Sequence, residues 1–126
     1  MGDLVADPVG AGEGVVGVVQ LALGVIFWTG NALGLVDLHQ LLGILLVLGL
    51  WTQAVLAARA GVEPRLVAVA AVWGLIVPIV GLTQTSLLTG SLHWLIQVIH
   101  LLLGIGLIGL AENLATRARA RLAPVA

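Results

Sequence analysis

Three histidines are the residues of this chain best suited to chemistry, and no cysteine accompanies them. His93 and His100 are seven residues apart, so on a helix they project from one face, about 10.5 Å apart along the axis. Gln97 lies between them on the same face. His39 comes much earlier in the chain. Imidazole nitrogens are ligands for metals and for haem iron, so the elements that carry these rings decide whether two of them can meet.

The composition is typical of a membrane protein. Sixty per cent of the residues are hydrophobic and 9% are charged, whereas roughly 25% are charged in soluble domains. A soluble chain of 126 residues cannot bury so much apolar surface. The net charge of −1, with no basic excess, argues against a nucleic-acid partner. We therefore expect the lipid bilayer to be the solvent and a bacterial inner membrane to be the location.

The positions of the charged residues predict the number of spans. No Asp, Glu, Lys or Arg occurs within residues 14–36, 38–58 or 66–111. A spanning helix needs about 20 residues, so the first two stretches hold one span each. The third is about twice as long and must fold back through its polar centre at 83–91.

This pattern predicts an all-α polytopic membrane protein, an antiparallel four-transmembrane-helix bundle. It consists of a single membrane domain over residues 1–126. The expected helices cover about 15–33, 36–59, 65–83 and 91–113, and a cytoplasmic basic tail follows at 114–126.

The arginines predict the orientation of the bundle. Arg59 and Arg65 flank the second connection, and Arg117, Arg119 and Arg121 follow the last span. The positive-inside rule makes both regions, and with them both termini, cytoplasmic. The second and fourth spans then run in the same direction, and all three histidines lie in the outer half of the membrane.

Two parallel helices with histidines at the same end can hold a flat macrocycle between them. A haem with two axial imidazoles needs one nitrogen on each face of the porphyrin. His39 can supply one, and either His93 or His100 can supply the other. Gly43 and Gly104, each four residues after a histidine, would leave room for the ring.

Other roles fit the same residues. A membrane histidine can serve as a hydrogen-bond partner between helices, and His93 can face the headgroup region. Zinc prefers three or four protein ligands, and Asp37 is the one further strong ligand nearby. Close helix packing is the ordinary role of glycines such as Gly43 and Gly104.

Three segments resemble one half of a haem A synthase. Val36-Asp-Leu-His-Gln-Leu-Leu-Gly43, with the apolar span that ends in Ala-Ala-Arg59, resembles its second helix. Val80-Gly-Leu-Thr-Gln84 and Gly90-Ser-Leu-His-Trp-Leu-Ile-Gln-Val-Ile-His100 are similar to the third and fourth helices. The resemblance covers roughly residues 14–113. It implies a four-helix half that binds haem through a histidine at the outer start of helix two, matched by His39, and another on helix four.

For this second ligand, the distance from the Gly-Ser of the outer loop favours His100. A difference in depth favours His93 instead, because His100 lies about six residues, or ~9 Å, deeper than His39 if both spans start at one level. We expect His39 and His100 to be the axial ligands, with His93 as a substitute or as the partner of a haem propionate.

The chain also departs from this family. Haem A synthases have eight helices in two halves, and this chain has the length of one half. Val36 stands where the family commonly has a glutamate, with Asp37 as the nearest acid, and the outer-loop cysteine pair is absent. The resemblance thus implies a haem-binding half more directly than it implies oxidation of a haem methyl group. A homodimer would rebuild the eight-helix arrangement.

Three functions follow as hypotheses. The first is a b-type haem protein, an electron carrier or haem-binding subunit, with His39 and His100 as iron ligands and Gly43, Gly104, His93 and Gln97 around the cofactor. The second is a cofactor-free structural subunit of a larger membrane complex. The third is a haem A synthase-like oxidoreductase that acts as an oligomer. We predict no catalytic residue, because the sequence has no nucleophile with a base, phosphate loop or carboxylate pair.

Overall fold

The computed structural model describes residues 3–125, with side-chain surroundings from residue 12 onward. The elements in chain order are α1 (Asp3–Trp28), η1 (Leu33–Leu35), α2 (Val36–Arg59), α3 (Pro64–Thr83), η2 (Gln84–Ser86) and α4 (His93–Leu122). No strand occurs within residues 3–125, which confirms the predicted all-helical class. The predicted domain also includes residues 1, 2 and 126, which lie outside the described part.

Three helical segments are long and apolar enough to cross a membrane: Leu33–Arg59, Pro64–Ser86 and His93–Leu122. Helix α1 contributes a shorter apolar segment, Gly12–Trp28. It ends earlier than the expected residue 33, because Gly30 and Ala32 adopt left-handed backbone conformations with φ of 77° and 54°. These residues close a turn inside the stretch that carries no charge.

Helix α4 is longer than its apolar part. It continues to Leu122, through most of the segment expected to be a basic tail. Leu114, Ala115 and Ala118 are buried along this extension, and alanine and arginine are both good helix formers. The charged residues therefore mark the expected end of the apolar span, whereas the helix itself goes on beyond it.

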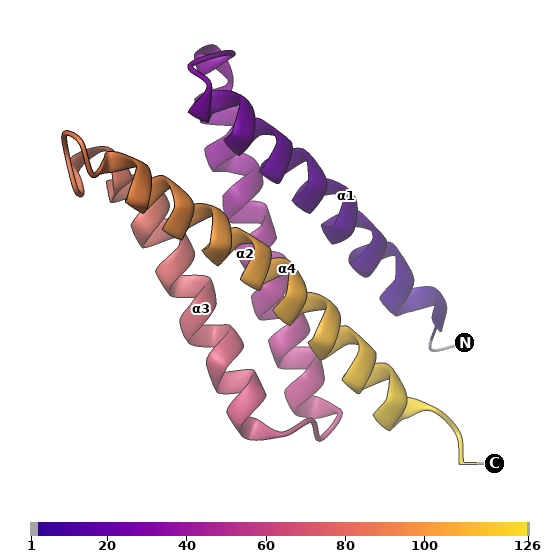
Figure 1. The fold of residues 1–126 in the computed structure, drawn as a ribbon. Coiled ribbons are helices and arrows are strands. Elements are labelled where there is room, and N and C mark those ends of the chain that lie inside the picture. Colours follow the sequence, from indigo (N-terminus) through magenta and orange to yellow (C-terminus); the bar gives the residue numbers. More distant parts are fainter. Residues whose placement is uncertain (1–2, 126) are drawn as a thin grey trace.

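Helices α2 and α4 occupy the centre of the arrangement, and each packs against all three other helices. Helices α1 and α3 lie on opposite sides of this central pair (Figure 1). The α1–α2 and α3–α4 connections lie at one end of the molecule, which we call the histidine end because His39, His93 and His100 are near it. The α2–α3 connection and the C-terminus lie at the other, which we call the arginine end (Figure 1).

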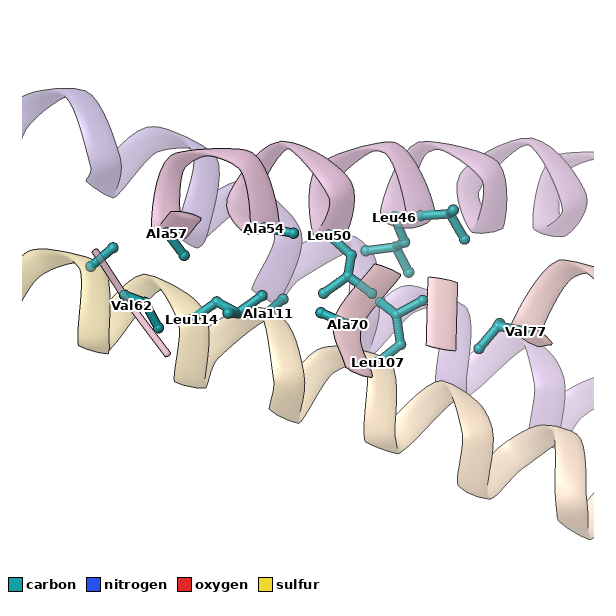
Figure 2. Packing of buried hydrophobic residues seen from close by; sticks show 12 residues of the cluster. Leu46, Leu50, Ala54, Ala57, Val62, Ala70, Val77, Leu107, Ala111 and Leu114 are labelled. Atoms are coloured by element: carbon teal, nitrogen blue, oxygen red, sulfur yellow. The ribbon is translucent and has the colours of Figure 1, made fainter. Parts of the chain in front are cut away.

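The buried core extends from the middle of the helices to the arginine end. Figure 2 shows that leucines alternate there with small residues from α2, α3 and α4. Leu50 and Leu114 are fully buried, as are Ala57 and Ala70. Helices that are surrounded by lipid have little hydrophobic drive to associate and pack through close contacts of small residues, and this core has the composition expected for such packing.

Two tryptophans connect neighbouring helices in this half. The Trp51 indole donates a hydrogen bond to the Ala71 carbonyl oxygen over 3.1 Å, and Trp73 donates to Leu103 over 2.9 Å. The Trp51 ring lies against Gly74 and the Trp73 ring lies against Gly106. A Cβ added at Gly106 would come within 2.6 Å of the Trp73 ring. Both glycine positions therefore let an indole approach the backbone closely.

The contact between Trp73 and Gly106 can be tested against a glycine one turn away on the same helix. We expect Gly106→Ala to lower the free energy of unfolding by about 1–3 kcal/mol, because the rigid indole must move. A Cβ at Gly109 meets nothing within 4 Å, so Gly109→Ala should be neutral or stabilising. Titration of the micelle-bound protein with a denaturing detergent, followed by tryptophan fluorescence, measures both. Equal destabilisation by the two variants would contradict this packing.

Candidate functional site: a histidine pair in a cavity between the helices

His39 of α2 and His100 of α4 lie next to each other. Their ring centroids are 6.3 Å apart and the ring planes are inclined at 66°. Phe27 of α1 packs its edge against His39, with centroids 5.3 Å apart. Two histidines from distant parts of the chain thus meet, and both are half-buried.

The two rings are level although they occupy different positions on their helices. His39 lies three residues after the start of α2 and His100 seven residues after the start of α4. At the rise of an α-helix, the difference corresponds to about 6 Å, so α4 begins roughly one turn farther out than α2. The depth difference that favoured His93 from the sequence is removed in this way.

His93 has different surroundings. Its Nδ1 lies 3.3 Å from the carbonyl oxygen of Leu87 in the α3–α4 connection. It lines the same cavity as the histidine pair, two turns closer to the histidine end. Gln97, one turn after His93 on α4, lines this cavity as well.

The cavity around the pair has a volume of about 330 Å³ and is lined by residues from all four helices. One glycine from each helix contributes to its wall: Gly24, Gly43, Gly81 and Gly104. Gly43 and Gly104 were predicted to leave space here, and both do line the cavity. Gly24 and Gly81 were not predicted, because the residues that face them come from other helices.

Gly81 determines where His100 can lie. A Cβ at this position would come within 2.8 Å of the His100 Cε1 atom, so a larger residue would displace the imidazole. Gly43 plays a similar part for Gln20, whose Nε2 lies 3.0 Å from the position of such a Cβ. The glycines therefore admit polar side chains from α1 and α4 in addition to leaving open space.

The polar atoms of the pair are incompletely satisfied. Gln20 Nε2 donates a hydrogen bond to the carbonyl oxygen of His39 over 2.8 Å. Within the described part of the chain, the Nδ1 atoms of His39 and His100 and the Oε1 atom of Gln20 are buried without a hydrogen-bond partner. Unpaired buried polar atoms are costly, and each one in a structure calls for an explanation. Gln20, His39 and His100 all line the cavity, so these atoms belong to its wall.

The protein itself supplies two strong ligands at this place. Among the residues from 12 to 125, no group of three or more His, Cys, Asp or Glu side chains is arranged to hold a metal ion. A metal bound between His39 and His100 must therefore bring its remaining ligands with it. The four nitrogens of a porphyrin meet this requirement, since a haem leaves two axial positions to the protein.

A second cavity of about 330 Å³ lies toward the arginine end, between α1 and α4. Glu13, Glu112, Thr116 and Arg119 provide its polar lining. No histidine lines this cavity, and no glycine in its wall faces an aromatic ring. The features predicted from the sequence gather in the other cavity.

Comparison with models of protein families, with curated proteins and with solved structures finds no match to this chain. The similarity of its segments to a haem A synthase half accordingly stays an expectation from the sequence. A function for the chain has to be inferred from its own residues.

The natural absence of cysteine allows a direct test of the histidine contact. We expect the double variant His39→Cys/His100→Cys to be cross-linked efficiently by a short bifunctional thiol reagent. Mass spectrometry reports the product as one added linker and the loss of both thiols. The control, His39→Cys/Leu102→Cys, places the second thiol on an exposed part of α4 and should react with two separate reagent molecules. Equal cross-linking of both pairs would contradict the arrangement.

Proposed function

We propose that this chain is an integral membrane haem protein in which His39 and His100 bind the iron of haem b from opposite faces. The observation that carries this proposal is the 6.3 Å between the two ring centroids. A metal about 2 Å from a nitrogen of each ring separates the centroids by roughly 6 to 6.5 Å. The centroid spacing of the pair thus matches that of two axial ligands.

The cavity around the pair supports the same proposal. Sites for small molecules and cofactors have volumes of about 300–1,000 Å³ and mostly apolar walls, and this one, at about 330 Å³, falls at the lower end. Its wall includes one glycine from each helix, at positions where a larger residue would project into the cavity or displace Gln20 and His100. A flat macrocycle between the central helices needs such a wall.

Two protein ligands define the class of chemistry. A haem with both axial positions occupied by imidazole supplies reversible one-electron transfer, with no free position for a substrate. The chain's own contribution is to hold the two rings, through Gly81 at His100 and through the Gln20 hydrogen bond beside His39. We therefore propose that the protein transfers electrons or serves as a haem-binding subunit. Haem methyl oxidation by an oligomer, as the family resemblance suggests, is not part of this proposal.

A cofactor-free structural subunit is the second candidate. The contacts of Gly74 with Trp51 and of Gly106 with Trp73 favour it, because they serve helix packing alone. The histidine end argues against it. Two half-buried imidazoles, each with a buried and unpaired Nδ1 atom, are costly in a subunit that only packs, and apolar residues of the same size would serve better.

We also propose that α1 is a fourth span and that the four spans form an antiparallel bundle with the arginines in the cytoplasm. The apolar segment Gly12–Trp28 is about 25 Å long as a helix, close to the ~30 Å of the hydrocarbon core. The exposed apolar side chains of all four helices face lipid. A second copy of the chain, or a larger membrane complex, is the expected partner.

The topology can be tested with single cysteines in the cysteine-free chain. We expect Asn31→Cys and Ser91→Cys to react with a membrane-impermeant maleimide in intact cells. Glu63→Cys and a cysteine appended to the N-terminus should react only after the membrane is opened. Labelling of the appended cysteine in intact cells would show that α1 does not cross the membrane.

Haem binding is tested by the absorption spectrum of the detergent-purified protein, oxidised and reduced, with haem supplied. The wild-type protein should show a Soret band of low-spin haem. The variants His39→Ala and His100→Ala should each lose the low-spin spectrum, because one axial nitrogen is missing. His93→Ala is the matched control on the same face of α4 and should keep it. A wild-type protein without a Soret band would overturn the proposal, and loss of the spectrum with His93→Ala but not with His100→Ala would overturn the choice of ligands.

A further inference from the structure

The cavity that contains the histidine pair has two chemically different ends. Toward the histidine end its lining includes the polar side chains of Gln40, Gln84, Thr85, His93 and Gln97. We call the four of these on η2 and α4 (Gln84, Thr85, His93 and Gln97) the mouth cluster. Toward the arginine end the lining is apolar, and we call Leu46, Val47, Val77 and Leu107 the floor.

The floor is continuous with the buried core of the protein. All four floor residues belong to the core cluster, and each is at most 8% exposed. Figure 2 shows Leu46, Val77 and Leu107 at one end of that cluster. A charged group in such surroundings, within the membrane, costs several kcal/mol. No charged part of a ligand can therefore be directed toward the floor.

The mouth cluster provides the opposite environment. Within the described residues, the side chains of Gln84 and Gln97 make no hydrogen bond to another protein group, so their amides are available as donors. His93 Nδ1 is near the Leu87 carbonyl oxygen. A histidine ring donates to a carboxylate through an N–H group, as the glutamine amides do.

The mouth cluster also contains no arginine or lysine. All five arginines lie near the arginine end of the helices, at positions 59, 65, 117, 119 and 121, and the chain has no lysine. The donors that a carboxylate at the mouth would meet are the amides of Gln84 and Gln97, the Thr85 hydroxyl and the His93 ring. This arrangement suits a group at the edge of the membrane rather than one buried deeply.

We propose that the mouth cluster is a carboxylate-binding subsite that determines the direction in which a flat, amphipathic ligand enters the cavity. The carboxylates lie at His93 and Gln97, and the apolar edge of the ligand contacts Leu46, Val77 and Leu107. This inference rests on the proposed function in taking haem as the ligand. The two propionates of the haem then point toward the histidine end and its vinyl edge points toward the core. His93 and Gln97 are then positioning residues and take no part in iron ligation.

The experiment compares ferric haem with its dimethyl ester, in which both carboxylates are masked. Each form is titrated into the purified apo-protein in one detergent and binding is followed by the Soret band. Because the two forms partition differently into micelles, the ratio of the two dissociation constants is measured for each protein and compared with the wild-type ratio, and the partition cancels in that comparison. Hydrogen bonds to charged groups change affinity about tenfold or more.

We expect His93→Leu and Gln97→Leu each to lower the ratio of the ester dissociation constant to the free-acid dissociation constant about tenfold relative to the wild-type protein. The binding of the ester itself should change little. Gln53→Leu is the control, because Gln53 is buried in α2 outside the cavity, and it should keep the wild-type ratio. Helical circular dichroism and the low-spin spectrum with the ester show whether each variant is folded.

The possible failures can be told apart. Low-spin spectra with both haem forms, together with an unchanged ratio in His93→Leu and Gln97→Leu, would overturn the subsite and leave haem binding by His39 and His100 intact. Absence of a Soret band with either form in the wild-type protein would overturn the proposed function, and the subsite for haem with it.

Discussion

The contact between the His39 and His100 rings determines how the helices in this half of the molecule are arranged. Both rings are polar, and in a protein with 9% charged residues polar groups inside the membrane must face the protein interior. Bringing them to one level makes α2 and α4 neighbours and starts α4 about one turn farther out. Helices α1 and α3 then pack on opposite sides of this pair. They contribute Gln20 and Gly81, which contact the two histidine residues.

The molecule divides its tasks along its length. Toward the arginine end, leucines, alanines, Trp51 and Trp73 fill the space among α2, α3 and α4, so this half carries most of the packing, although a second cavity lies between α1 and α4. Toward the histidine end, glycines replace larger side chains and a cavity remains. A cavity costs stability wherever it occurs, and a well-packed half next to it lets the helices tolerate that cost. The same division gives the cavity an apolar floor and a polar mouth.

The sequence predicts the helices well because their ends are marked locally. Pro64 begins α3 at a first-turn position, and left-handed Gly30, Gly61 and Gly90 stand in the three connections. The first charged residue after the last apolar stretch leads us to expect that the last helix ends near residue 113, whereas α4 continues to Leu122. A charge can mark the end of an apolar span, but residues with high helix propensity continue the helix past it. Of the site, His39 and His100 could be chosen in advance only with the help of a family resemblance, because His93 fits the same helix face.

The parts of the site that sequence reasoning missed all depend on contacts between distant segments. Gly81 is one glycine among 17, and its importance comes from His100, which faces it across a helix interface. The hydrogen bond from Gln20 of α1 to the His39 carbonyl oxygen joins residues 19 positions apart, and no local pattern marks it. The Trp51 indole likewise donates to the Ala71 carbonyl oxygen of a neighbouring helix, 20 positions away in the chain. The register of one helix against another cannot be predicted from local sequence patterns.

The central claim, that one iron is bound by His39 and His100 from opposite sides, is tested most directly by electron paramagnetic resonance of the purified ferric protein at low temperature. The account predicts a low-spin signal typical of two axial nitrogen ligands, with no high-spin component. A purely high-spin signal would mean that at most one of the histidines reaches the iron and would contradict the claim. So would a protein that takes up no haem at all.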